Sequence, residues 1–161
     1  MKKVLLAILA VMIFLPAFAN KKTDKETLVW RYEVQDLNKV AKDGKSIIFK
    51  IWSYAKKDKL ALNQAGKNAV HAVIFKQIGY NPALAGSSSL DEHQDEIKAF
   101  FKDGGEYMHY VQFVNNGAVA PGDKIKLPKE WKIGVTVSVN RADLKKCLEE
   151  KGWIKSMKSL F

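Results

Sequence analysis

Residues 47–80 most constrain the fold of this chain, because a strongly apolar strand is followed there by a long helix rich in alanine. In the segment Ile47–Tyr54, apolar side chains fall on both faces of an extended chain, and Lys50 is the exception. A strand of this kind is covered at least in part on both sides. We therefore expect it to lie at the centre of a sheet.

The segment Lys57–Ile78 predicts a single helix. Small or apolar side chains recur along one side of it at helical spacing, namely Leu62, Ala65, Ala69, Ala72 and Val73. Short side chains on this side would let the helix axis lie close to the sheet. Gly66 costs about 1 kcal/mol relative to Ala inside a helix, and its presence indicates a close backbone contact.

Alternating residue types predict further strands. The clearest is Trp131–Asn140, where apolar and polar side chains alternate as in antiparallel sheets with one buried and one solvated face. The other expected strands are Leu28–Val34, Glu106–Val114 and a short Lys124–Leu127. We expect a turn over Asp36–Lys45, in which the Asp43-Gly44 pair predicts a hairpin between the first two strands.

Two more helices complete the predicted order. Ser89 and Glu92 form a capping-box pattern that opens a helix over Leu90–Lys102. Asn140 caps a last helix, whose inner stripe contains the only cysteine, Cys147, as a small buried hydrophobe. The order β-β-α-α-β-β-α predicts an α+β fold: an antiparallel sheet of four or five strands with helices packed on one face.

The first nineteen residues have the pattern of a secretory signal peptide. A positive tip, Met1–Lys3, precedes an apolar run, Val4–Leu15, and Ala17–Ala19 is a small-x-small triplet. We predict cleavage between Ala19 and Asn20 and a periplasmic or secreted product. The apolar run is shorter than the roughly twenty residues that span a bilayer, so no transmembrane segment is expected in the mature chain.

The mature chain is predicted to contain a disordered leader over 20–27 and a single domain over 28–161. It carries 25 basic and 17 acidic residues, a net charge of about +8 with His neutral. Such a balance suits anionic partners. A general role in solubility is nevertheless the favoured interpretation of the composition by itself, because lysine outnumbers arginine and is spread along the chain.

Several segments resemble a family of small exported bacterial proteins of unknown function. They are Ile51–Tyr54, Asn68–Phe75, Phe100–Gly105, Val135–Asn140 and Leu144–Gly152. More loosely, the Ala-rich helix and the terminal strand followed by a Leu-x-x-x-Leu-x-x-x-Gly helix are similar to the N-terminal domain of flagellar assembly protein T and related small lipoproteins. This resemblance implies a cell-envelope module of assembly or binding type without known catalysis, and it supplies no functional residues. The chain departs from the lipoproteins by lacking the cysteine that carries their lipid.

One stripe of the predicted long helix is not explained by packing. Gln64, Asn68 and His71 lie along it and are candidates to line a ligand-binding groove, although a hydrogen-bonded histidine at the border of the core is the more ordinary interpretation. His93 stands three residues before Glu96, a spacing at which the two could share a cation. No second His or Cys stands at ligand spacing, so we predict no metal site.

The best cluster of basic and aromatic residues is Lys124, Lys126 and Lys129 with Trp131. An indole offers a flat apolar face, and the ammonium groups supply the charge that an anionic glycan or lipid headgroup needs. Nucleic acid can use the same chemistry, but the predicted export argues against it. A solvated hairpin in which Trp131 begins the buried face is the more ordinary interpretation of this cluster.

The sequence has no Gly-rich phosphate loop, no Ser elbow and no Cys-x-x-Cys motif. We therefore predict an exported, non-catalytic module of the cell envelope that acts through an envelope protein or an anionic envelope polymer, without a cofactor. The alternative hypothesis is a small-molecule or metal-binding enzyme that uses His71 or His93. An edge strand could also pair two copies of the chain.

Overall fold

The structure is a computed structural model in which residues 30–86 and 91–155 are described. The predicted signal peptide over 1–19 and the predicted leader over 20–27 lie outside these residues. So do the first two residues of the strand predicted over Leu28–Val34, and Ser89 of the predicted capping box. These predictions therefore stay predictions.

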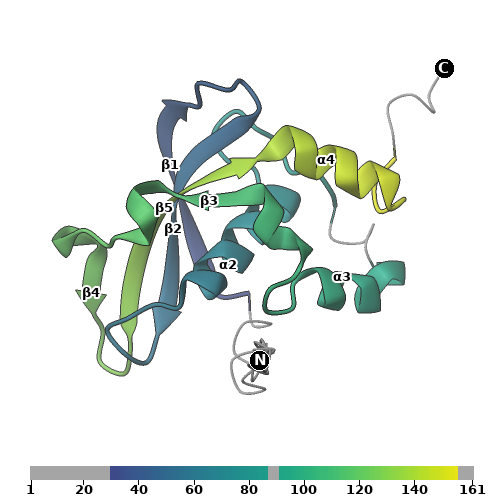
Figure 1. Cartoon of the computed structure of the whole chain (residues 1–161). Helices are drawn as coiled ribbons and strands as arrows, with labels where there is room; N and C mark the ends of the chain where they lie inside the picture. The colour runs from purple at the N-terminus through teal and green to yellow at the C-terminus, as the bar shows by residue number, and fades with distance from the viewer. Residues whose placement is uncertain (1–29, 87–90, 156–161) are drawn as a thin grey trace, which may run out of the picture.

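The described residues form a five-stranded antiparallel sheet and three α-helices (Figure 1), which confirms the predicted α+β fold. The strands are β1 Tyr32–Val40, β2 Ser46–Ala55, β3 Val111–Phe113, β4 Lys124–Lys126 and β5 Trp131–Asn140. The α-helices are α2 Leu62–Phe75, α3 Gln94–Phe100 and α4 Arg141–Glu150, and the 3-10 helices are η2 Glu106–Tyr110, η3 Val114–Gly117 and η4 Pro121–Asp123. β2 lies between β1 and β5, and β3 and β4 both pair with β5.

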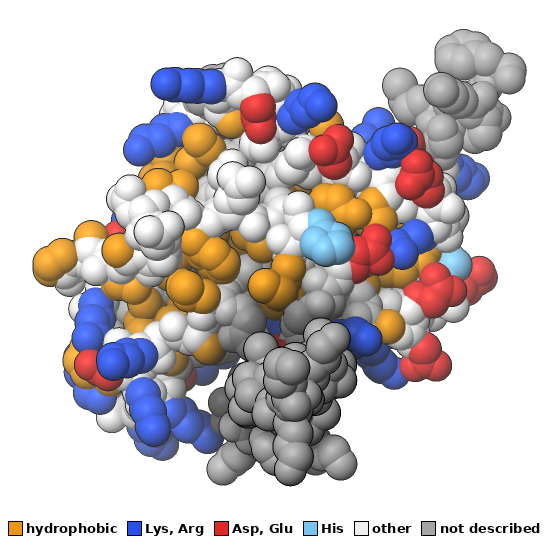
Figure 2. All heavy atoms as spheres, viewed as in Figure 1, with side chains coloured by type: hydrophobic (Ala, Val, Ile, Leu, Met, Phe, Trp, Pro, Cys, Tyr) orange, Lys and Arg blue, Asp and Glu red, His pale blue; other side chains and the backbone are white. Residues whose placement is uncertain are grey.

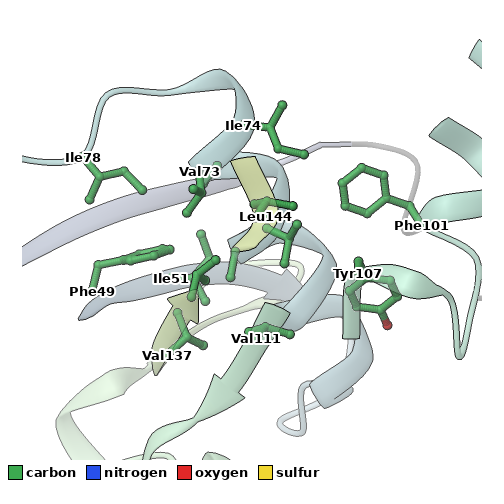
Figure 3. Close-up of a cluster of buried hydrophobic side chains, with 14 of the residues drawn as sticks. Phe49, Ile51, Val73, Ile74, Ile78, Phe101, Tyr107, Val111, Val137 and Leu144 are labelled. Atoms are coloured by element: carbon green, nitrogen blue, oxygen red, sulfur yellow. The ribbon is translucent and has the colours of Figure 1, made fainter. Parts of the chain in front are cut away.

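The central position predicted for β2 is confirmed, and one face of its middle part is fully buried. Along this part of β2 and the adjoining part of β5, alternate residues have an exposed fraction of 1% or less; these residues are Phe49, Ile51, Ser53, Ile133, Val135, Val137 and Val139. Figure 3 shows how some of these side chains meet residues of the helices, among them Val73 of α2 and Leu144 of α4. The opposite face of β2 carries Ile48, Trp52 and Tyr54 and is only half-buried.

Helix α2 approaches the sheet closely, as its small residues predict. Ala65 and Ala69 are completely buried. A Cβ atom built on Gly66 would lie 3.3 Å from ring atoms of both Tyr107 and Phe113, which is the close contact expected of this glycine. Leu62, in contrast, is 39% exposed and does not belong to the buried side of the helix.

The predicted length of this helix, Lys57–Ile78, is wrong at both ends. Residues 56–61 form a loop of charged residues before α2, and Lys76 already has an extended backbone with φ of −124°. After it, Ile78 and Asn81 form an isolated antiparallel bridge around Gly79, which has a positive φ of 56°. Helical spacing therefore predicts the middle of α2 correctly. The helix ends at Phe75, four residues before the glycine that was expected to end it.

Three other predicted elements differ from the structure. The helix predicted over Leu90–Lys102 is α-helical only over Gln94–Phe100, after a 3-10 turn at residues 91–93, and Leu90 lies outside the described residues. The turn predicted over Asp36–Lys45 is shorter, because β1 continues to Val40 through an irregularity in pairing at which Asn38 takes a positive φ of 51°. The strand predicted over Glu106–Val114 begins as the 3-10 helix η2 and becomes strand only in β3. The predicted Asp43-Gly44 hairpin, the Asn140 cap of α4 and the burial of Cys147 are confirmed.

Replacement of Ala69 by Leu tests the contact between α2 and the sheet. We expect Ala69→Leu to lower the free energy of unfolding by about 1–3 kcal/mol, because the larger side chain overfills a fully buried site. Urea titration followed by circular dichroism measures this change. Ala61→Leu makes the same substitution at an exposed residue just before α2 and should stay within about 0.5 kcal/mol of the parent. Equal effects of the two substitutions would contradict the close packing.

Candidate functional site

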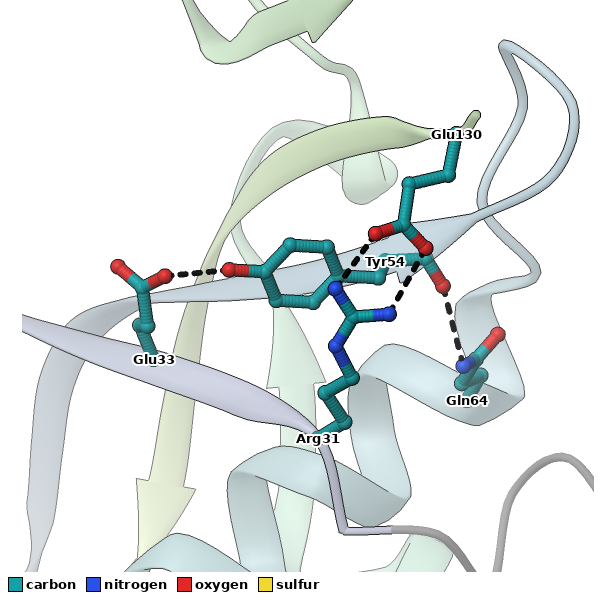
Figure 4. A network of polar contacts seen from close by, with 5 residues as sticks. All are labelled: Arg31, Glu33, Tyr54, Gln64 and Glu130. Carbon is teal, nitrogen blue, oxygen red and sulfur yellow. Dashed lines mark hydrogen bonds and ion pairs between the residues drawn. The ribbon is translucent and has the colours of Figure 1, made fainter. Parts of the chain in front are cut away.

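The stripe of Gln64, Asn68 and His71 serves the packing of α2 in this structure. Asn68 is 2% exposed and donates from Nδ2 to the hydroxyl of Ser53 at 2.8 Å, so it joins the helix to the buried face of β2. Gln64 reaches the backbone carbonyl of Tyr54 at 3.5 Å (Figure 4). Each polar side chain of the stripe thus has its own partner in the fold, and a ligand groove along it stays a prediction.

His71 lies in an aromatic cluster at the border of the core. Its ring stacks on Trp30 with 3.8 Å between ring centres, its Nδ1 is 2.7 Å from the hydroxyl of Tyr32, and Phe75 packs nearby. Burial lowers the pKa of His71 to about 3, and the charge of Lys76 acts in the same direction. The imidazole is therefore neutral near pH 7 and fits the role of a hydrogen-bonded boundary histidine.

The predicted pair of His93 and Glu96 is present, with 3.5 Å between Nδ1 and Oε1. The other oxygen of Glu96 accepts a hydrogen bond at 2.8 Å from the indole of Trp153, and this bond is the main reason why the pKa of Glu96 is lowered. Within 30–86 and 91–155, no three His, Cys, Asp or Glu side chains gather as ligands of a metal ion would. Glu96 thus holds Trp153, which follows α4, against α3.

A groove of about 460 Å³ between α3, η2 and α4 is a candidate that sequence inspection missed. Glu106 lies in it and accepts hydrogen bonds from Cys147 Sγ at 3.2 Å and from Lys151 Nζ at 2.8 Å. Burial raises the pKa of the Cys147 thiol, which disfavours the thiolate that a nucleophile needs. In the sequence, only the four-residue spacing of Cys147 and Lys151 could have indicated this group. Glu106 comes from a distant segment, so its contact with them could not be predicted.

The basic and aromatic cluster predicted around Trp131 is assembled in the structure. β4 pairs with the start of β5, and this pairing places Lys126 Nζ 4.6 Å and Lys124 Nζ 5.4 Å from the centre of the Trp131 ring. Lys129 is exposed in the connection between the two strands. Both distances lie within the range of a cation–π interaction.

The loop before α2 extends this cluster, a contact that the sequence did not predict. Lys124 binds Asp58 at 2.9 Å and so ties the loop to β4. We name the combined surface the lysine ridge; it consists of Lys56, Lys57, Lys59, Lys124, Lys126 and Lys129. Figure 2 shows blue side chains gathered at the lower left, where this loop and the β4–β5 hairpin lie in Figure 1.

The nearby carboxylate of Glu130 does not cancel the charge of the lysine ridge. Both of its oxygens bind the guanidinium of Arg31, at 2.5 and 2.9 Å (Figure 4). The same guanidinium lies 4.0 Å from the centre of the Tyr54 ring. Asp58 is likewise held by Lys124. The ridge therefore keeps an excess of positive charge.

A second aromatic and basic group lies on the half-buried face of the sheet. The Trp52 ring covers Gly134 on the neighbouring strand, and Lys50 and Lys132 approach it to 5.4 and 5.3 Å. Lys50 is bound by Asp123 and Lys132 by Glu33. These ion pairs neutralise the two lysines and link neighbouring segments of the sheet. Less positive charge is therefore left to attract an anionic partner.

The free energy of unfolding should depend on pH, because His71 is buried and neutral in the folded chain. The unfolded chain binds a proton near pH 6.5 and the folded chain only near pH 3, so the free energy of unfolding should fall as pH drops from 6.5, by at most about 1.4 kcal/mol per pH unit. His71→Phe keeps a ring between Trp30 and Phe75 and should flatten this profile between pH 6.5 and 5.

Urea titrations of both proteins at several pH values give the two profiles. Above pH 7, where the histidine is neutral in the folded and the unfolded chain, the profiles should run parallel, offset by the loss of the Tyr32 partner. A parallel course below pH 6.5 as well would show that His71 does not carry the pH dependence.

Comparison of the chain with family models, with curated proteins and with solved structures gives no match. Of the helices in the described ranges, none is both long and apolar enough to cross a bilayer. Among the described residues, the lysine ridge is the surface on which a predicted site and an observed cluster coincide.

Proposed function

We propose that this protein is an exported, non-catalytic module of the cell envelope that binds an anionic envelope polymer through the lysine ridge. The observation that carries the proposal is the position of Lys124 and Lys126 over the ring of Trp131. A single surface thus gathers several ammonium groups around one half-buried indole. That combination suits a polymer of charged sugars, whose anions meet the lysines and whose rings pack beside the exposed part of the indole.

The form of the ridge supports a polymer over a single compact ligand. Its cations come from two segments, the loop over 56–59 and the hairpin over 124–131, which Lys124 and Asp58 join. Lysine ammonium groups are point charges on flexible stems and lack the fixed fork of arginine. A row of such groups can bind a polymer with regularly repeated negative charges in many alternative registers. Its affinity should therefore depend on the charge density of the polymer and less on the exact shape of the polymer.

The alternative, an enzyme that uses His71 or His93, has less support from the geometry. His71 is stacked and hydrogen-bonded within an aromatic cluster, and His93 has one carboxylate partner. Metal analysis of protein purified without an affinity tag separates the two proposals. A stoichiometric metal ion that is lost from His93→Gln would favour the enzyme.

Charge neutralisation of the ridge tests the proposal directly. The variant Lys124→Gln/Lys126→Gln/Lys129→Gln should bind dextran sulfate about tenfold more weakly than the parent. Three exposed ionic contacts at about 0.2–1 kcal/mol each sum to about 0.6–3 kcal/mol, and about 1.4 kcal/mol, within this range, corresponds to tenfold. Binding is measured by fluorescence anisotropy of labelled polymer over a range of salt concentrations. Parent affinity should fall steeply with salt, and the variant should show a smaller slope.

A matched control removes the same charge elsewhere. Lys98, Lys145 and Lys146 are exposed on α3 and α4, each near a carboxylate of its own helix. Their triple replacement by Gln should leave affinity within about twofold of the parent. Equal losses in the two triple variants would show that net charge alone attracts the polymer, and an unchanged affinity of the ridge variant would overturn the proposal.

A further inference from the structure

A second cavity, of about 350 Å³, lies at the other end of β2 from the lysine ridge. It is formed where the β1–β2 turn meets the start of α4, and the backbone amide of Ala142 there donates to the carbonyl of Lys45 at 3.2 Å. β2 has ten residues, and a strand rises about 3.3 Å per residue. The two surfaces are therefore roughly 30 Å apart. Figure 1 shows the β1–β2 turn and the β4–β5 hairpin at opposite ends of the sheet.

The cavity is lined by three cationic side chains, Lys39, Lys45 and Arg141. No Asp or Glu of the described residues lines it. Nearby carboxylates are used elsewhere: Asp43 accepts hydrogen bonds from the backbone and hydroxyl of Ser46, and Asp143 accepts one from Asn140. None of the three cations has an ion pair with another described residue. Asp43 and Asp143 keep their negative charge but do not line the cavity, so the lining itself is positively charged.

Arg141 carries a buried donor that the protein does not use. Its Nη2 donates to the carbonyl of Pro82 at 2.9 Å. In the described part of the chain, its Nε is the single buried side-chain nitrogen or oxygen that lacks a hydrogen-bond partner. Buried charged groups are normally paired, because an unpaired one loses its hydration without compensation. Burial lowers the pKa of this guanidinium.

We propose that this cavity binds the phosphate group of a small molecule, held by Arg141, Lys39 and Lys45. A phosphate group has several acceptor oxygens and can meet the accessible part of the Arg141 guanidinium together with the two ammonium groups of the lining. Arginine is the side chain whose geometry matches such an oxyanion. This site requires no contribution from the first amides of α4, since those of Ala142 and Asp143 already have partners.

The size of the cavity indicates the class of ligand. A volume of about 350 Å³ falls at the lower end of small-molecule sites, which span roughly 300–1,000 Å³. Inorganic phosphate would occupy only part of it. A phosphate ester with a short polar body, or the headgroup of a phospholipid, would occupy more. Both sources share the phosphate chemistry, and the experiment distinguishes them.

The first measurement is a titration of the whole mature chain with inorganic phosphate and with glycerol 3-phosphate at constant ionic strength, followed by ¹H–¹⁵N NMR. The Nε–H signal of Arg141 should move on addition of either compound, and glycerol 3-phosphate should bind more tightly. Chloride at the same ionic strength should leave this signal in place. Absence of any phosphate-specific movement would overturn the proposal.

Variants then separate the cavity from general charge. Arg141→Gln should weaken glycerol 3-phosphate binding at least tenfold, as measured by calorimetry, and Arg141→Lys should restore it only in part. Lys42→Gln removes one charge from the same turn but lies outside the cavity lining, so it should change the affinity less than twofold. If Arg141→Gln fails to fold, Lys39→Gln/Lys45→Gln gives the same test at two exposed residues. Equal weakening by Lys42→Gln would contradict a built site.

A last arm identifies the source of the phosphate and keeps this site apart from the lysine ridge. Vesicles of phosphatidylglycerol should compete with glycerol 3-phosphate for the Arg141 signal if the ligand is a lipid headgroup, and should leave it unaffected if the ligand is a free phosphate ester. The ridge variant Lys124→Gln/Lys126→Gln/Lys129→Gln should retain glycerol 3-phosphate binding. A loss of binding in that variant would show that the phosphate interacts with the ridge and that the cavity is not the site.

Discussion

The arrangement of this protein depends on how closely α2 can approach the sheet. Ala65 and Ala69 present almost no side chain, and at Gly66 even a Cβ atom would press on the rings of Tyr107 and Phe113. At this short distance the hydrogen bond between Asn68 and Ser53 forms inside the core, where both groups are fully removed from water. An unpaired amide or hydroxyl would be costly there, so the bond fixes the rotation of the helix as well as its distance.

The position of α2 also sets where the surfaces lie. The loop over 56–61 must connect the end of β2 to the start of the helix, and it therefore lies beside the β4–β5 hairpin, to which Lys124 and Asp58 bind it. At the other end of β2, the β1–β2 turn meets α4 directly. The two basic surfaces thus lie at the two ends of β2.

The sequence predicted those parts of the fold whose signals are local. Alternation defined β5, and the Asp43-Gly44 pair and Asn140 each mark a boundary by their own turn or cap chemistry. The prediction of a strand was wrong over Glu106–Tyr110. The aromatic residues there fit the alternation of a strand, but the segment forms a 3-10 helix that buries Tyr107 beside Gly66. The same limit applies to the site. Lys124, Lys126 and Trp131 are close in sequence and were found, but the cavity of Lys39, Lys45 and Arg141 joins segments about a hundred residues apart.

The distribution of ion pairs explains why the ends of the sheet, and not its middle, are the surfaces suited to anions. Cations on the half-buried face are matched one to one: Lys50 binds Asp123, and Lys132 binds Glu33. Such pairs hold neighbouring strands together and cancel the local field. At the ends pairing is incomplete: Lys124 binds Asp58, but Lys126 and Lys129 on the ridge, like Arg141 in the cavity, have no ion pair with another described residue. Unpaired like charges repel one another and cost stability. A bound anion would relieve that cost at either end, so stabilisation by a polyanion and stabilisation by a small phosphate should be additive over a separation of roughly 30 Å.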